Sequence, residues 1–166
     1  NTFSYEIADN IIKKEELDSQ GIYTSIGTYD IKEMKLLVRN LSLETKISEN
    51  DLYYKFGEYL FDRFRKLYPH FFEMSNNSFD FLKKIENIIH IEVKKLYPDS
   101  ELPKFEFKDI SENEMIMSYI SERNIPYLAK GLISKTFNFF NENIDIKMES
   151  STKNILITNF YLIKKE

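Results

Sequence analysis

Apolar residues recur at helical spacing over the first half of the chain, whereas they alternate with polar residues over much of the second half. The pattern predicts helices over 4–17, from Asp30 to about 41, and over 48–67, the last ended by Pro69. Their expected apolar faces are Tyr5, Ala8, Ile11 and Ile12, then Met34, Leu37, Val38 and Leu41, then Tyr53, Phe56, Leu60 and Phe64. Ser48 and Asp51 are spaced to cap the third helix.

A further amphipathic helix is predicted between Ser78, the expected N-cap, and Pro98. Its stripe consists of Leu82, Ile85, Ile89, Val93 and Leu96, which are 3, 4, 4 and 3 residues apart. At 100° per residue His90 lies at the edge of this stripe, beside Glu86, Val93 and Tyr97. We therefore expect His90 to point along the wall of a pocket.

After Pro103 the chain alternates in period two over KFEFK and again over MIMSYIS, which predicts a hairpin around a turn at 109–113. A helix from about Pro126 should cover this sheet with Leu128, Leu132, Thr136 and Phe139. Two further strands are predicted over 145–149 and 154–163. We expect an α+β fold, in which a helical part (1–77) packs against a part with an antiparallel sheet (78–166).

Length and charge narrow the possible functions. A chain of 166 residues fits one domain, and 23 basic against 27 acidic residues give a net charge of −4, which argues against a nucleic-acid partner. There is no cysteine, so neither a disulfide nor a thiolate ligand is available. No apolar run has the length of a membrane span, and we expect a cytoplasmic protein without a membrane partner.

The two histidines are the candidate metal ligands. A histidine beside an apolar stripe is more often a hydrogen-bonded core residue than a ligand, so His90 alone leaves both interpretations open. His70 is the rival ligand, but it is expected in a turn between aromatic residues, where partial exposure is the ordinary outcome.

After the predicted hairpin turn, three side chains that can donate hydrogen bonds occur close together in the sequence. If MIMSYISER continues as a strand, Tyr119, Ser121 and Arg123 project to one side, behind Met115 and Met117. Two hydroxyls and a guanidinium in a row suit an anion with several oxygens, which an arginine can bind through two parallel bonds. The alternative is a solvated strand end.

Motifs of other chemistries are missing. The sequence has no glycine-rich phosphate loop, no HExxH, no nucleophile elbow and no EF-hand loop. Carboxylate pairs such as Glu15 and Glu16 lie on charged helix faces. We expect no enzymatic activity.

The spacing of the candidate site residues, taken together, resembles the motif of one protein family. His90, the Tyr-x-Ser-x-Arg run 29 residues later, and Pro103 resemble the haem nitric oxide/oxygen-binding (H-NOX) domain, the sensor domain of soluble guanylate cyclase and its bacterial relatives. The likeness extends over GIYTSIGTYD (21–30), FGEYLF (56–61), YPHFF (68–72) and HIEVKKLYPDSELP (90–103). Family members carry a further helix ahead of the position matching Asn1, and we expect that segment to have been removed from, or disordered in, the sample.

The resemblance implies a single haem-binding sensor domain over 1–166, with b-type haem as cofactor. His90 would ligate the iron, Tyr119, Ser121 and Arg123 would bind the propionates, and Pro103 would press on the macrocycle. Nitric oxide and carbon monoxide would be the ligands, since Leu60 and Leu128 stand where oxygen-holding relatives have polar residues. The signal would pass to a separate protein such as a histidine kinase or a cyclic-nucleotide enzyme. The alternative is a haem-independent ligand-binding or scaffolding module of the same fold.

Overall fold

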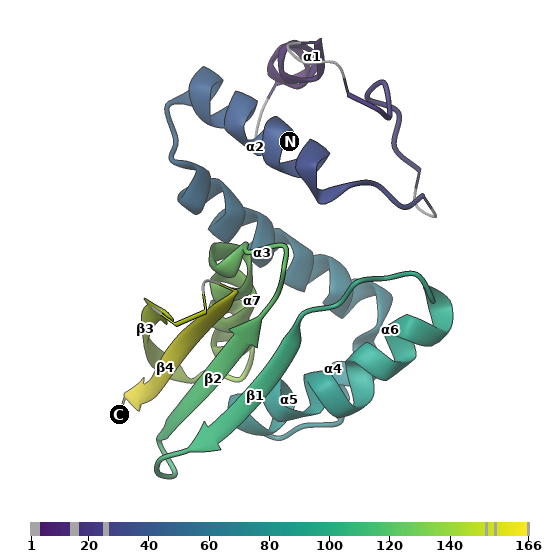
Figure 1. Cartoon of the computed structure of the whole chain (residues 1–166). Helices are drawn as coiled ribbons and strands as arrows, with labels where there is room; N and C mark the ends of the chain where they lie inside the picture. The colour runs from purple at the N-terminus through teal and green to yellow at the C-terminus, as the bar shows by residue number, and fades with distance from the viewer. Residues whose placement is uncertain (1–3, 14–16, 25–26, 152, 155, 166) are drawn as a thin grey trace. The chain divides into compact units, whose positions relative to one another are not determined.

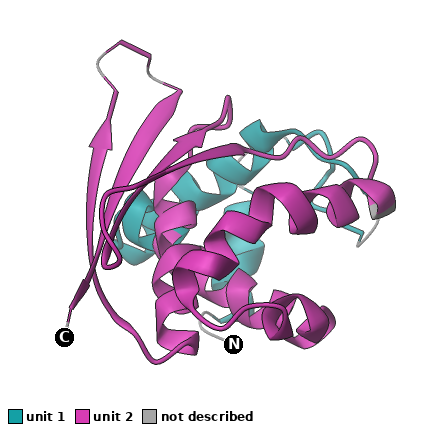
Figure 2. Ribbon diagram, turned by 90° about the horizontal axis from the view of Figure 1, so that it is seen from below, with its two compact units in different colours: residues 1–53 teal, residues 54–166 magenta. Residues whose placement is uncertain are grey.

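The computed structural model describes residues 4–13, 17–24, 27–151, 153–154 and 156–165, without the side chain of Leu96. The chain forms two compact units, residues 1–53 and 54–166, which divide inside one helix (Figure 2). The single-domain assignment, with its internal boundary after residue 77, stays a prediction.

The first unit consists of α1 (Tyr5–Lys13), α2 (Ile31–Thr45) and the start of α3 (Glu49–Leu67). The predicted start of α2 at Asp30 and the predicted cap of α3 at Ser48 are confirmed. Asp30 accepts the backbone N–H of Lys32 at 2.8 Å, and the Ser48 hydroxyl accepts that of Asp51 at 3.1 Å. Tyr5, which was expected on a buried face, is instead 84% exposed. Helix α1 was predicted to run to residue 17, but Leu17 is not helical, and residues 14–16 lie outside the described residues.

The second unit begins with the rest of α3, which ends at Leu67 as the following Tyr68-Pro69 predicts. The expected face of α3 is only partly confirmed. Tyr53 is buried, but Phe56 and Phe64 are 38% and 44% exposed, whereas Phe61 is buried. The buried side is the one on which Gly57 lets α3 approach α7 (Pro126–Phe139) closely. After α3, residues Pro69–Glu73 form the short helix α4 where a turn was expected.

A continuous helical run, Ser78–Leu96, follows in three parts: α5 (Ser78–Lys84), a π-helical turn η1 (Ile85–Ile89) and α6 (His90–Leu96). The N-cap is Asn77, whose side chain accepts the N–H of Asp80 at 2.9 Å, and not Ser78 as predicted. Ser78 is instead fully buried, and its N–H and hydroxyl both donate to Glu142. Asn77 therefore caps the helix, and Ser78 holds the first turn of the helix against Glu142.

The four predicted strands form one antiparallel sheet in the order β1 (Lys104–Asp109), β2 (Glu114–Ile120), β4 (Ile157–Lys165), β3 (Asn143–Ser150). The register places Phe105 opposite Tyr119 and Met117 opposite Phe160. Because side chains alternate along a strand, Met115, Met117 and Tyr119 share the buried face, as the pattern predicted.

Helix α7 lies against the buried face of the sheet, and α5 packs beside it (Figure 1). The side chains of α7 that meet the sheet are Ala129, Ile133 and Phe137, whereas Leu132 and Phe139 pack against a second aromatic cluster of Phe61, Phe71, Phe72 and Phe81. The predicted sheet-facing set was therefore wrong. A helix between two apolar clusters has two apolar faces, and periodicity does not distinguish them.

Within the described residues, none of the helices combines the length and the apolar character that crossing a bilayer requires.

Glu142, in the turn between α7 and β3, bonds residues of α5 and β4, and these bonds lead to a prediction about stability. Its carboxylate accepts bonds from Ser78 and, at 2.8 Å, from the Lys164 ammonium. Burial alone would raise the pKa of Glu142, but the hydrogen bonds from Lys164 and Ser78 outweigh it and hold this pKa below its ordinary value.

Replacing Glu142 by glutamine should therefore destabilise the protein by about 1–3 kcal/mol at pH 7. Because the folded-state pKa is lowered, this difference is complete above the unfolded pKa of about 4.3 and is lost as the pH falls through the folded value. Urea unfolding at neutral and acidic pH measures it. Glu112→Gln, at an exposed position, is the control, and a difference that did not vary with pH would contradict the prediction.

The crossing of α3 and α7 gives a second prediction. A Cβ atom at Gly57 would collide with the backbone oxygen of Leu128, and one at Gly131 with that of Tyr54. Gly57→Ala should lower the free energy of unfolding by about 1–3 kcal/mol, because a backbone oxygen cannot move aside without separating the helices. In Gly27→Ala the new atom would meet only the end of the Tyr29 side chain, so this control should cost less in the same denaturation measurement.

Candidate functional site

His90 begins α6 directly after the π-helical turn, and its N–H bonds to the carbonyl of Ile85, five residues earlier. Single π-turns inside α-helices are rare and occur frequently at functional sites. The helical periodicity placed His90 on this helix correctly, but it assumed a regular α-helix and did not predict the widened turn.

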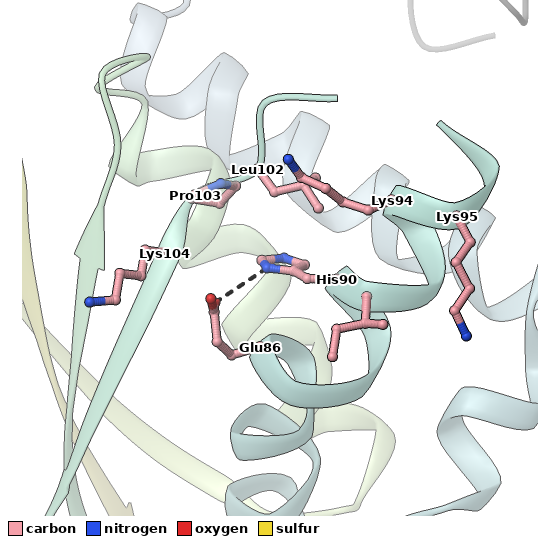
Figure 3. Close-up of a pocket in the computed structure, with 8 residues that line it drawn as sticks. Glu86, His90, Lys94, Lys95, Leu102, Pro103 and Lys104 are labelled. Atoms are coloured by element: carbon pink, nitrogen blue, oxygen red, sulfur yellow. Dashed lines mark ion pairs between the residues drawn. The ribbon is translucent and has the colours of Figure 1, made fainter. Parts of the chain in front are cut away.

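The side chain of His90 is held by a carboxylate from the preceding turn. Nδ1 of His90 lies 3.3 Å from Oε2 of Glu86, and the same oxygen accepts the backbone N–H of Phe105 at 3.1 Å. Figure 3 shows both side chains extending from the helix toward the segment that enters β1. The histidine is thus linked through Glu86 to strand β1.

The environment keeps the imidazole neutral. Burial lowers the pKa of His90, and the opposing effect of the nearby Glu86 carboxylate does not overcome it. The side chain is only 16% exposed. A neutral imidazole whose Nδ1 faces a carboxylate has its other nitrogen free to bind a metal ion.

His70, the rival ligand, lies on α4 and is exposed, with its ring centroid 4.2 Å from that of Phe71. It has neither the burial nor the carboxylate partner of His90.

A cavity of about 440 Å³ opens beside His90, a volume within the range of small-molecule sites. Pro103 and His90, both predicted site residues, line it together (Figure 3). Its other lining residues are Glu86, Ile91, Lys94, Lys95, Leu102 and Lys104. The remaining predicted site residues do not line this cavity.

Tyr119 is connected to His90 through an aromatic side chain. The ring of Phe105 lies 5.5 Å from that of His90 and 6.0 Å from that of Tyr119, measured between centroids. Tyr119 is buried, and its hydroxyl accepts the N–H of Ile125 at 3.5 Å.

The strand does not continue to Arg123 as predicted, because β2 ends at Ile120 and the chain turns. Ser121 stabilises this turn, with its hydroxyl accepting the N–H of Arg123 at 3.2 Å and its carbonyl accepting that of Asn124. Tyr119 therefore lies on β2, whereas Ser121 and Arg123 follow the end of the strand, so the three residues do not share one strand face. Serine at such a position competes with the sheet for backbone groups, which alternation alone does not reveal.

The guanidinium of Arg123 is incompletely paired. Nη2 lies 3.7 Å from a carboxylate oxygen of Glu101, whose side chain is 84% exposed. Nε is buried and has no hydrogen-bond partner among the described residues. A buried donor of this kind needs an acceptor, and an anion bound here would supply one.

The two predicted gas-side leucines lie on the helices that cross at Gly57, Leu60 on α3 and Leu128 on α7, and both are partly buried. Of the neighbouring tyrosines, Tyr59 is 58% exposed and Tyr127 is partly buried. Sequence reasoning did not assign a role to Glu86, Phe105 or Glu101. Of these three, only Glu86 could have been found from the sequence, because a residue four positions before His90 lies on the same face of a helix.

Comparison with known proteins gave a family match and several similar solved structures. A sequence model of the haem-NO-binding family matches residues 1–148. The search of curated proteins gave no match. Among solved structures, the unliganded Fe(II) H-NOX protein from K. algicida is 38% identical, with a TM-score of 0.92 over 98% of this chain and 88% of that one.

Two further structures are similar. A mutant of the K. algicida protein is 39% identical, with a TM-score of 0.94 over 99% of this chain and 89% of that one. The H-NOX from Shewanella woodyi, solved bound to IWP-051 in the Fe(II)CO state, is 34% identical, with a TM-score of 0.82 over 98% of this chain and 86% of that one.

These matches confirm the expected fold, helices with a four-stranded antiparallel sheet. The domains of this family bind haem b and act as gas sensors. With the family match covering most of its length, the chain belongs to the haem-NO-binding (H-NOX) family.

Proposed function

We propose that this chain binds haem b through His90, senses nitric oxide and reports to a separate signalling protein, with residues 1–166 acting as one sensor domain. The observation that carries the proposal is the neutral, half-buried imidazole on a cavity wall, oriented by Glu86. His90 would hold the haem iron, and the haem, when bound, would supply the centre that takes up a diatomic gas.

The donor set near the end of β2 fits the anionic edge of such a cofactor. Arg123 would bind propionate oxygens, since its buried Nε has no acceptor among the described residues and its only ion-pair partner there is the exposed Glu101. Tyr119 and Ser121 would add neutral hydrogen bonds from their hydroxyls. Pro103, which shares the cavity with His90, would press against the macrocycle.

The part of the pocket in which the gas binds would be apolar. Leu60 and Leu128 have no hydrogen-bond donor in their side chains, so they would favour nitric oxide and carbon monoxide over oxygen, which depends more on a donated bond. The nearest tyrosine hydroxyls in the sequence belong to Tyr59 and Tyr127.

His90 would also generate the signal. It begins α6 and follows a π-turn, so a change in the histidine–iron bond would act directly on the junction between η1 and α6. A ligand shifts such an equilibrium only through different affinities for the two states, and the histidine bond provides that difference. The partner would be a protein such as a histidine kinase or a cyclic-nucleotide enzyme, and this chain itself would perform no catalysis.

Absorbance tests the function directly. Protein supplied with haem should show a Soret band, and His90→Gly should lose or shift it because the axial nitrogen is gone. Added imidazole should restore the spectrum of the His90→Gly variant, whereas His70→Gly should resemble the unchanged protein. Absence of a Soret band in the unchanged protein would favour a haem-independent binding or scaffolding module.

The propionate clamp predicts an order of effects. Arg123→Ala should weaken haem retention roughly 10- to 100-fold, because a hydrogen bond to a charged group contributes about 1.5–3 kcal/mol. Tyr119→Phe and Ser121→Ala each remove a neutral bond and should cost less. Haem transfer to apomyoglobin measures all three, with Arg63→Ala as the exposed control. Equal retention in all variants would mean that this segment does not hold the propionates.

The apolar gas side predicts which ligand is held. The ferrous protein should bind nitric oxide and carbon monoxide but should not hold oxygen stably in air, as absorbance spectra recorded over minutes would show. If oxygen is held and Tyr127→Phe abolishes this, the donor is Tyr127 and the assignment of Leu128 to the pocket is wrong.

A further inference from the structure

We propose that Glu86 is a positioning residue that selects the tautomer of His90, directs Nε2 toward the iron and strengthens the histidine–iron bond. This inference rests on the proposed function only where the iron is concerned. The selection of the tautomer concerns the protein chain alone.

The contacts of Glu86 fix its carboxylate between two elements. Oε2 lies 3.3 Å from Nδ1 of His90 on the helix and accepts the N–H of Phe105 from β1 at 3.1 Å. An oxygen held by a backbone N–H cannot easily follow a rotating ring. The imidazole is therefore anchored to the sheet as well as to its own helix.

Among the described residues, none of the lysines that line the cavity forms an ion pair with this carboxylate. Lys104, which lines the same cavity, pairs with Glu106 at 2.7 Å. Lys95, another residue that lines the cavity, pairs with Glu92 at 2.6 Å. The Glu86 carboxylate thus remains available to accept the Nδ1 proton of His90.

The chemical consequence follows from the two nitrogens of imidazole. With Nδ1–H donated to Glu86, the lone pair resides on Nε2, the atom that must bind the metal. A carboxylate acceptor makes the ring more basic, strengthens its bond to the metal and stabilises the oxidised iron. Partners of this kind typically change metal affinity 10- to 100-fold when they are removed.

Glu86 would thereby set how readily the histidine bond responds to a gas. The stronger the pull of Glu86 on the Nδ1 proton, the more tightly His90 stays on the iron. The same carboxylate also ties the ring to β1, so releasing His90 from the iron would leave it attached to the sheet.

The first test uses the haem-free protein. Nitrogen-15 NMR of the His90 ring should report a proton on Nδ1 in the unchanged protein, and in Glu86→Ala this preference should be lost. Glu86→Gln keeps an amide oxygen as acceptor and should retain the Nδ1–H form. Glu92→Ala removes a carboxylate of α6 that pairs with Lys95 and not with His90; it is the matched control and should change nothing. An unaltered tautomer in folded Glu86→Ala would overturn the inference.

The second test uses the haem-loaded protein. The iron–histidine stretching frequency should fall and the reduction potential of the iron should rise in Glu86→Ala, with Glu86→Gln in between and Glu92→Ala unchanged. The affinity of the protein for haem should fall about 10- to 100-fold in Glu86→Ala. If haem stays bound to His90 and these values do not move, Glu86 has no such role, and the proposed function stands. If haem does not bind at all, the proposed function fails, while the NMR result still decides the role of Glu86 in the chain.

Discussion

The site depends on one arrangement, a half-buried neutral imidazole whose Nδ1 faces a carboxylate that is itself held by a backbone N–H. Glu86 meets both His90 and Phe105 through the same oxygen, at 3.3 and 3.1 Å. Burial disfavours the charged form of the ring, and the carboxylate orients the neutral form without reversing that preference. A ligand prepared in this way needs no reorganisation before it binds a metal.

The rest of the second unit holds the two sides of this arrangement in place. Buried Ser78, bonded to Glu142, fixes the start of the helical run, and Leu82 packs in the core with Met115, Met117 and Phe160 of the sheet. The register that sets Phe105 opposite Tyr119 then places the edge strand where Glu86 can reach its backbone. The position of the histidine is thus a result of sheet register and helix anchoring together.

Sequence patterns predicted the parts that depend on periodicity and composition. The predicted features that are present are the four strands, the helix start at Asp30, the cap at Ser48, the end of α3 before Pro69 and the helix bearing His90. The π-turn, the end of β2 at Ile120 and the sheet-facing side of α7 were not predicted. These depend on competition for backbone hydrogen bonds and on packing between two apolar clusters, neither of which leaves a periodic signal. The roles of the site residues remain predictions.

A crystal structure of the haem-loaded protein would test the central claim most directly. It should show the iron bonded to Nε2 of His90, Nδ1 still beside Glu86, and propionate oxygens against Arg123. Iron bonded to His70, or haem lying away from His90, would contradict the assignment of His90 as the ligand.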